Sequence, residues 1–200
     1  STRGYMVIVS CTMVFHPTTC VAAYSSEDIT MTDTRDIPAA FAGQVDLASA
    51  DLDGRTLACS DDFFASMDHL VRPAPAVFDP DAYTERGKLM DGWESRRKRV
   101  PGHDWCIVKL GVPGLVRGVD IDTAFFMGNH PPYASIEGCN VDAGTDIDAL
   151  RTTVEWTEIV PSMPLQRGSH NLQAVSHLGV WTHVRLRIYP DGGVARLRIW

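Results

Sequence analysis

The sequence has few of the motifs that mark well-known enzyme and binding classes. It contains no CxxC pair and no HxH or HExxH spacing, and it has no GxSxG, P-loop or GxGxxG motif set between a strand and a helix. These absences argue against a zinc knuckle, a thioredoxin-like redox site, a histidine-cluster metal site, a serine hydrolase and a nucleotide-binding enzyme. No window sustains the 3.6-residue apolar period of a long amphipathic helix, so a helical bundle is also disfavoured.

The composition is that of an acidic globular protein. Among 200 residues, 18 are Lys or Arg and 25 are Asp or Glu, giving a formal net charge of −7. A protein that binds nucleic acid or a membrane surface normally carries the opposite sign, so neither partner is expected. The five cysteines are scattered and odd in number, which favours reduced thiols in a cytoplasmic protein.

The first thirty residues differ in composition from the rest of the chain. Residues 5–15 form an uncharged apolar run that is too short to span a bilayer, which needs about twenty residues. A second methionine, Met31, precedes a stretch that resembles an ordinary N-terminus. We expect residues 1–30 to lie outside the folded domain, either disordered or upstream of the true start, with an export signal as the alternative.

The rest of the chain is patterned for short strands. Apolar and polar residues alternate over 183–189 and again over 194–200, and the turn residues Pro190 to Gly193 lie between them. This pattern predicts a terminal β-hairpin with arginines on its outer face. Other expected strands are 105–110, 134–141 and 152–159, and short helical turns are expected near 61–67 and 146–150. The fold class is therefore predicted as all-β, a β-sandwich rather than an α/β sheet.

A dense polar segment covers residues 85–105 and combines basic, acidic and aromatic side chains. This mixture favours a pocket for a small anion, while a solvated basic loop and a nuclear-address sequence are the alternatives. The candidate functional residues of the segment are Trp93, Glu94, Arg96, Arg97, His103 and Asp104.

A second candidate cluster follows at 120–129. On a strand, Asp120 and Asp122 share one face about 7 Å apart. Two carboxylates so placed can hold a divalent metal, pair with arginines of the polar segment, or act as base and stabiliser. The alternative is the solvent face of an edge strand. Asn129 follows in a loop and offers an amide contact.

The stretches 87–106 and 118–132, supported by 60–65 and 189–196, resemble the allantoicase family over about residues 45–200. The resemblance implies a jelly-roll β-sandwich of galactose-binding-like type, the first of two related domains. It also implies a cytoplasmic, homo-oligomeric enzyme that hydrolyses allantoate to ureidoglycolate and urea. Leu89 and Met127 depart from the family pattern, where a tryptophan and a threonine are expected.

A mechanism follows as a hypothesis from these residues. Arg96 or Arg97 binds the substrate carboxylate, and His103, oriented by a neighbouring acid such as Asp104, transfers the proton. Asp120, Asp122 or Glu94 accepts ureido hydrogens or positions water, Asn129 adds an amide contact, and Trp93 flanks the site. The residues identify no cofactor, and a divalent metal held by carboxylates stays open as an alternative. The alternative function is a non-catalytic galactose-binding-like module for a carbohydrate or other small ligand.

Overall fold

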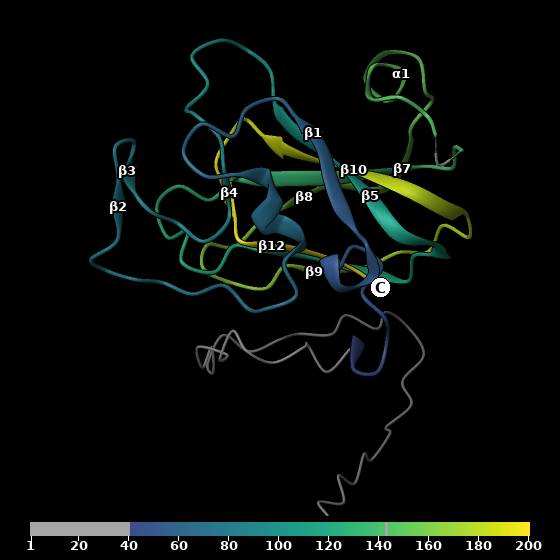
Figure 1. Cartoon of the computed structure of the whole chain (residues 1–200), viewed down its shortest axis with the longest axis horizontal. Coiled ribbons are helices and arrows are strands. Elements are labelled where there is room, and N and C mark those ends of the chain that lie inside the picture. Colours follow the sequence, from purple (N-terminus) through teal and green to yellow (C-terminus); the bar gives the residue numbers. More distant parts are fainter. Residues whose placement is uncertain (1–40, 143) are drawn as a thin grey trace, which may run out of the picture. The chain divides into compact units, whose positions relative to one another are not determined.

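The computed structural model describes residues 41–142 and 144–200, so the expectations for residues 1–30 lie outside the described part (Figure 1). Within it the chain is mostly β, with one short α-helix and two 3₁₀ turns. The elements in chain order are η2 (Ala50–Leu52), β1 (Arg55–Cys59), η3 (Met67–Val71), β2 (Tyr83–Thr84), β3 (Gly87–Lys88), β4 (Trp93–Glu94), β5 (Asp104–Leu115), β6 (Gly118–Asp122), β7 (Tyr133–Cys139), α1 (Ile147–Thr152), β8 (Thr157–Pro164), β9 (Leu172–Ala174), β10 (Val180–Tyr189), β11 (Gly193–Val194) and β12 (Arg196–Ile199).

Two antiparallel sheets form the layers of a sandwich. The larger sheet has the order β1-β5-β10-β7-β8 and the smaller has the order β12-β6-β9. Two short pairs, β11-β4 and β2-β3, complete the described strands. The arrangement confirms the predicted all-β sandwich.

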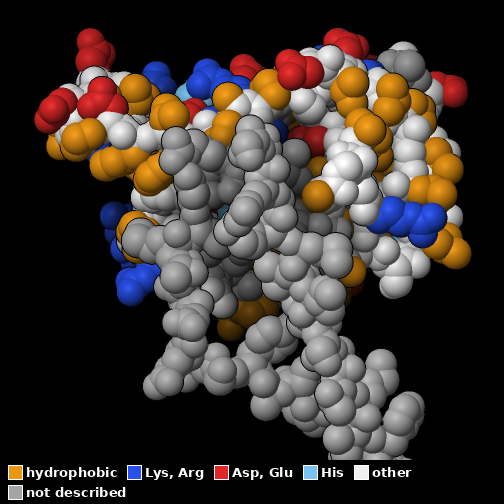
Figure 2. All heavy atoms as spheres, turned by 90° about the horizontal axis from the view of Figure 1, so that it is seen from below, with side chains coloured by type: hydrophobic (Ala, Val, Ile, Leu, Met, Phe, Trp, Pro, Cys, Tyr) orange, Lys and Arg blue, Asp and Glu red, His pale blue; other side chains and the backbone are white. Residues whose placement is uncertain are grey.

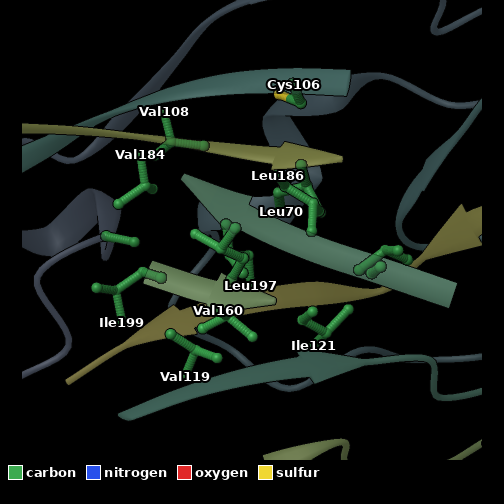
Figure 3. Packing of buried hydrophobic residues seen from close by; sticks show 14 of the residues in the cluster. Leu70, Cys106, Val108, Val119, Ile121, Val160, Val184, Leu186, Leu197 and Ile199 are labelled. Carbon is green, nitrogen blue, oxygen red and sulfur yellow. The ribbon is translucent and has the colours of Figure 1, made fainter. Parts of the chain in front are cut away.

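The core lies between the inner faces of these two sheets. On β10, Val184 and Leu186 point inward and are fully buried, because side chains alternate across a strand. They face Ile121 of β6 and Leu197 of β12, as Figure 3 shows. Burial of apolar side chains at roughly 25 cal/mol per Å² is the main stabilising contribution of this layer.

The predicted terminal hairpin is wrong. β10 pairs with β5 and β7 in the larger sheet, whereas β12 pairs with β6 in the smaller one. Residues 190–193 therefore carry the chain from one layer to the other instead of reversing it within one sheet. The arginines of β12 do not form an outer face either, because Arg196 is buried, at 2% exposed.

The shorter local predictions have mixed outcomes. The helical turn expected near 146–150 is confirmed as α1, which Asp146 caps by accepting a hydrogen bond from the Ala149 N–H at 2.7 Å. The expected strand at 152–159 is wrong in its first half, since β8 begins at Thr157. The helical turn expected at 61–67 is also wrong, because Ala65 forms a β-bridge to Glu94 and the 3₁₀ turn starts later.

Figure 2 shows one face of the molecule, and where it is drawn in colour, acidic, basic and apolar side chains are interspersed. That part of the surface is therefore not a uniformly basic patch of the kind that follows a nucleic-acid backbone. The helices of the described residues are all too short or too polar to cross a bilayer.

Candidate functional site

A pocket of about 480 Å³ opens where the β2–β3 hairpin, β4 and the loop after β6 meet. We call it the Glu94 pocket. Its walls combine aromatic and thioether side chains with two cations, one carboxyl and one amide, a mixture typical of sites for small polar ligands. The lining residues are Phe64, Phe78, Arg86, Gly87, Lys88, Met90, Glu94, Phe125, Met127, Gly128 and Asn129.

The backbone of Glu94 is held from two sides. Its N–H donates to the Ala65 carbonyl at 3.1 Å, and its carbonyl accepts from the Ala65 N–H at 3.3 Å. On the other side, β4 pairs with β11, where Glu94 lies opposite Gly193. The side chain of Glu94 is thus presented from a fixed position, as a catalytic or binding group requires.

The loop that carries Asn129 is fixed by polar contacts and close packing. Thr123 Oγ1 donates to the Gln166 carbonyl at 2.6 Å, and the Asn129 carbonyl accepts from the Gly193 N–H at 2.8 Å. Gly192 has a φ of +142°, and a Cβ at this position would lie 2.6 Å from the Asn129 carbonyl oxygen. Only glycine lets the two loops approach this closely.

Glu94 and Asn129 form the polar centre of the pocket. Asn129 Nδ2 donates to Glu94 Oε1 at 2.6 Å. Burial raises the pKa of the Glu94 carboxyl, and the hydrogen bond from Asn129 opposes that rise. A carboxyl with a raised pKa is suited to deliver a proton, and the amide oxygen of Asn129 remains available to accept one hydrogen bond from a ligand.

Two cations of the β2–β3 hairpin reach the same pocket. Arg86 Nη1 donates to the Phe63 carbonyl at 2.8 Å, and its guanidinium lies 4.8 Å from the Phe63 ring. Lys88 Nζ donates to the Pro80 carbonyl and lies 4.9 Å from the Phe78 ring. Neither cation forms an ion pair within residues 41–142 and 144–200, so their charge is available to an anionic ligand.

Three of the predicted substrate-binding residues lie elsewhere. Arg96 is held by Asp61, whose Oδ2 lies 2.7 Å from Nε and 2.5 Å from Nη2. Arg97 is exposed to solvent, and Trp93 is fully buried in the core with its Nε1 donating to the Asp61 carbonyl at 2.8 Å. The cations that line the Glu94 pocket are instead Arg86 and Lys88.

The predicted pair His103 and Asp104 does not line the Glu94 pocket. Asp104 is 1% exposed, pairs with Lys98 Nζ at 2.5 Å and accepts from Ser60 Oγ at 2.8 Å. Both partners contact Asp104 Oδ1, and no hydrogen bond joins Asp104 to His103 among the described residues. The imidazole of His103 instead lies in a different pocket beside Arg187, where burial and nearby cations lower its pKa.

The two acidic residues of β6 are buried rather than solvent-facing. Asp120 Oδ2 lies 2.5 Å from His170 Nδ1, and its Oδ1 accepts from the Asn171 N–H at 2.9 Å. Burial raises the pKa of Asp122 to about 6. The expected pairing of these carboxylates with the arginines of the polar segment is not seen, because His170, which the sequence analysis missed, is the partner of Asp120.

A divalent metal finds no ready site in the described part of the chain. Residues 41–142 and 144–200 contain no group of three or more His, Cys, Asp or Glu side chains arranged to hold a metal ion. The Asp120 carboxylate pairs with the His170 imidazole, and the Glu94 carboxyl accepts a hydrogen bond from the Asn129 amide.

The structure thus unites Glu94 and Asn129, which the sequence analysis selected, and adds Arg86 and Lys88, which it did not assign. Both cations lie in the polar segment that had been singled out. The missed signal was their position at and just after the turn of the β2–β3 hairpin, where both side chains reach the pocket. Met127, one of the two departures from the family pattern, also lines the pocket.

Comparison with known proteins gives a consistent result. The family model described as the allantoicase repeat matches residues 45–200. A protein named probable allantoicase 1, from Burkholderia mallei, is 49% identical over 156 residues, which cover 78% of this chain and 45% of that relative. The chain therefore spans about half the length of the curated relatives it matches.

Solved structures agree on the architecture. The allantoicase from Saccharomyces cerevisiae is 34% identical with a TM-score of 0.66, and the match covers 78% of this chain and 47% of that one. A family 32 carbohydrate-binding module from C. perfringens, solved with galactose, has a TM-score of 0.50 at 11% identity; the match covers 78% of this chain and 98% of the module. This second likeness concerns the fold alone, and it confirms the galactose-binding-like sandwich.

Proposed function

Since this chain belongs to the allantoicase repeat family, we propose that it provides a site for the hydrolysis of allantoate to ureidoglycolate and urea. The Glu94 pocket is the proposed site. The observation that carries the proposal is the hydrogen bond of 2.6 Å between Glu94 and Asn129, in a pocket that also holds two cations with no carboxylate partner among the described residues.

The substrate defines what the site must supply. Allantoate carries one carboxylate and two ureido groups on a single carbon atom. Arg86 and Lys88 provide positive charge for the carboxylate, and the amide oxygen of Asn129 accepts a hydrogen bond from a ureido N–H. Phe64, Phe78 and Phe125 form apolar walls beside these polar groups, and a lower local dielectric strengthens polar contacts.

The chemical step needs an acid because a urea anion is a poor leaving group. Glu94, whose pKa is raised by burial, donates the proton of its protonated form to the leaving ureido nitrogen as the C–N bond breaks. The lone pair of the remaining ureido nitrogen stabilises the carbon, which gains iminium character. Water then adds to this carbon and returns a proton to the Glu94 carboxylate, so that urea and ureidoglycolate leave and the acid is restored.

The test measures urea release from allantoate together with allantoate binding by calorimetry. Glu94→Gln is expected to slow urea release about 10²–10⁴-fold while leaving binding within a few-fold, because only the proton transfer is lost. Glu158→Gln, at an exposed glutamate of β8, is the matched control. Turnover by Glu94→Gln that stays within a few-fold of this control would contradict the assignment.

A second pair of variants tests the cations. Arg86→Gln and Lys88→Gln are each expected to weaken allantoate binding about tenfold or more, because a charge-assisted hydrogen bond is lost. This readout remains informative if the 200-residue chain binds allantoate without turning it over. Unchanged affinity in both variants would place the substrate outside the Glu94 pocket.

The alternative of a non-catalytic carbohydrate-binding module has only the fold in its support. A sugar site needs aromatic platforms but has little use for two cations and a carboxyl of raised pKa. Calorimetry with galactose distinguishes the two functions. Binding of galactose with an affinity above that of allantoate would favour the module.

The proposal includes self-association and a cytoplasmic location. Cys59, Cys106 and Cys139 are free thiols within the described residues, which suits a reducing compartment. Size-exclusion chromatography with light scattering measures the assembly, and a mass of 22.0 kDa would contradict a homo-oligomer.

A further inference from the structure

A second pocket, of about 270 Å³, lies on the outer face of the five-stranded sheet. We call it the arginine pocket. It draws on the start of β5, on β10 and on the end of α1, and none of its residues lines the Glu94 pocket. The lining residues are His103, Trp105, Ile107, Arg151, Thr152, Arg185 and Arg187.

Strand alternation places two of the arginines on this face. Val184, Leu186 and Ile188 of β10 point into the core, so Arg185 and Arg187 point outward. In the register with β5, Arg185 lies opposite Ile107 and Arg187 lies opposite Trp105. The third arginine, Arg151, comes from the last turn of α1, the helix whose Leu150 packs against Ile107 on this outer face.

The positive charge in the pocket exceeds the negative charge. Arg185 Nε and Nη2 each lie 2.6 Å from Glu137 Oε2, and Arg187 Nε lies 3.1 Å from the same oxygen. Arg187 Nε is buried and has no partner in hydrogen-bond geometry among the described residues. Arg151 forms no ion pair within residues 41–142 and 144–200, so the pocket has three guanidinium groups and one carboxylate, that of Glu137, which pairs with Arg185 and Arg187.

Two of the guanidinium groups make cation–π contacts with tryptophan rings. The Arg185 guanidinium lies 4.6 Å from the Trp156 ring, and the Arg151 guanidinium lies 5.6 Å from the Trp105 ring. Stacking of this kind uses the face of the guanidinium plane and leaves its N–H groups along the edge free to donate. The rings therefore orient the arginines without consuming their hydrogen-bond donors.

His103, which lies beside these arginines, is affected by their positive charge. Burial lowers the pKa of His103, and the charges of Arg187, Lys98 and Arg185 lower it further. The imidazole is neutral at pH 7 and adds one N–H donor to the wall. The pocket is thus rich in donors and carries a net charge of about +2 from three arginines and one glutamate.

We propose that the arginine pocket binds a phosphate group, as free phosphate or as a phosphomonoester, at a site separate from the Glu94 pocket. A dianion matches the excess charge, and a tetrahedral group offers oxygens in more than one plane to guanidinium groups that come from α1 and β10. A carboxylate offers two oxygens in one plane and satisfies one guanidinium. The volume of about 270 Å³ accommodates a phosphate group and bridging water.

The test is calorimetric titration of the purified chain with inorganic phosphate in chloride buffer at constant ionic strength. We expect a dissociation constant of about 1 mM or lower. Arg187→Gln and Arg151→Gln are each expected to weaken binding about tenfold or more. Arg151 is exposed and lies outside the Glu137 ion pair, so its replacement is compatible with folding. Arg117→Gln, at an exposed arginine outside both pockets, is the control.

Each outcome decides the proposal. Loss of phosphate binding in the two pocket variants but not in Arg117→Gln supports it. No binding by the unaltered chain, equal weakening in all three variants, or acetate binding as tightly as phosphate would overturn it, because these results indicate no site, general screening or a carboxylate site. A phosphomonoester that binds more tightly than phosphate identifies the ester as the ligand, and the reverse identifies free phosphate. Displacement of phosphate by allantoate would overturn the claim of a separate site.

Discussion

Arg196 and Asp91 form a buried ion pair in which Arg196 Nη2 lies 2.8 Å from Asp91 Oδ2. The same guanidinium also donates to the backbone carbonyls of Ala74 at 2.8 Å and of Asp91 at 3.0 Å. It therefore ties the segment that leads into the Glu94 pocket to β12 of the smaller sheet. The alternating pattern around Arg196 had suggested an exposed arginine, and the structure shows a buried anchor.

Arg196→Met is expected to destabilise the protein by about 1–3 kcal/mol, because it removes one of the two arginines that pair with the Asp91 carboxylate and leaves the buried carbonyls of Ala74 and Asp91 without this donor. Chemical denaturation of the variant measures this loss. Arg55→Gln, which breaks the exposed pair with Asp53, is the control and is expected to change stability by less than about 1 kcal/mol. Equal effects of the two substitutions would contradict the anchoring role.

Gly192→Ala is expected to lower stability by more than about 1 kcal/mol and to weaken allantoate binding. The added Cβ would meet the Asn129 carbonyl oxygen at 2.6 Å, at a φ of +142° that alanine rarely adopts. Gly128→Ala is the matched control for stability, since a Cβ there meets nothing within 4 Å. The measurements are thermal unfolding and calorimetry. A Gly192→Ala protein as stable as Gly128→Ala would show that the close approach is dispensable.

The pH dependence of urea release is expected to follow Glu94. Burial raises the pKa of this carboxyl, and the proposed step needs its protonated form, so the rate should fall as pH rises through that raised pKa. In Glu94→Gln the rate should be low and lack this decline. A wild-type profile that instead rises with pH over the same range would assign the proton donor to another group.

Asp122 is expected to make the folded state less stable as pH rises from about 4 to about 6. Its folded pKa of about 6 lies above the ordinary value of 3.8 for an aspartate, so over this window the folded state binds more protons than the unfolded state. The contribution is fully present below the lower value and is lost as pH rises through the higher one. Chemical denaturation from pH 4 to 8 measures the free energy of unfolding. Asp122→Asn should reduce the loss of stability with rising pH, whereas Asp62→Asn, at an exposed carboxyl, should leave this loss unchanged.

His170 is expected to titrate above its ordinary value because of Asp120. The hydrogen bond to the Asp120 carboxylate raises the pKa of the imidazole, so its stabilising contribution is present below pH 6.5 and is lost as pH rises through the folded pKa. NMR titration should show the His170 pKa falling in Asp120→Asn. Asp142→Asn, at an exposed carboxylate, should leave the titration unchanged; an equal shift in both variants would argue against the direct pair.

Alternation along the chain predicted several of the strands and the sandwich, because those strands have one face in the core, but it did not predict β1 or β9. It did not show that β10 and β12 belong to different sheets. The turn residues from Pro190 to Gly193 are a local signal, whereas the partners of these strands, Cys106 for Leu186 and Ile121 for Leu197, are distant in sequence. Local patterns cannot choose between distant partners.

The same limit applies to the candidate site. Glu94 and Asn129 were selected from separate motifs, and only the fold brings them within 2.6 Å. Arg96 was selected as a free cation, but it forms an ion pair with Asp61, which lies 35 positions earlier in the chain. The charge of a residue can be read from the sequence, whereas the partner that neutralises this charge depends on tertiary contacts.

The crossing of the chain at residues 190–193 has a consequence for biosynthesis. β10 occupies the middle of its sheet, between β5 and β7, and β12 pairs with β6 of the opposite layer. Until residues 180–199 have left the ribosome, the earlier strands lack their central partner and expose unpaired edges. The domain is therefore committed to folding late in its own synthesis, and a nascent chain arrested before residue 180 is expected to be a substrate for chaperones.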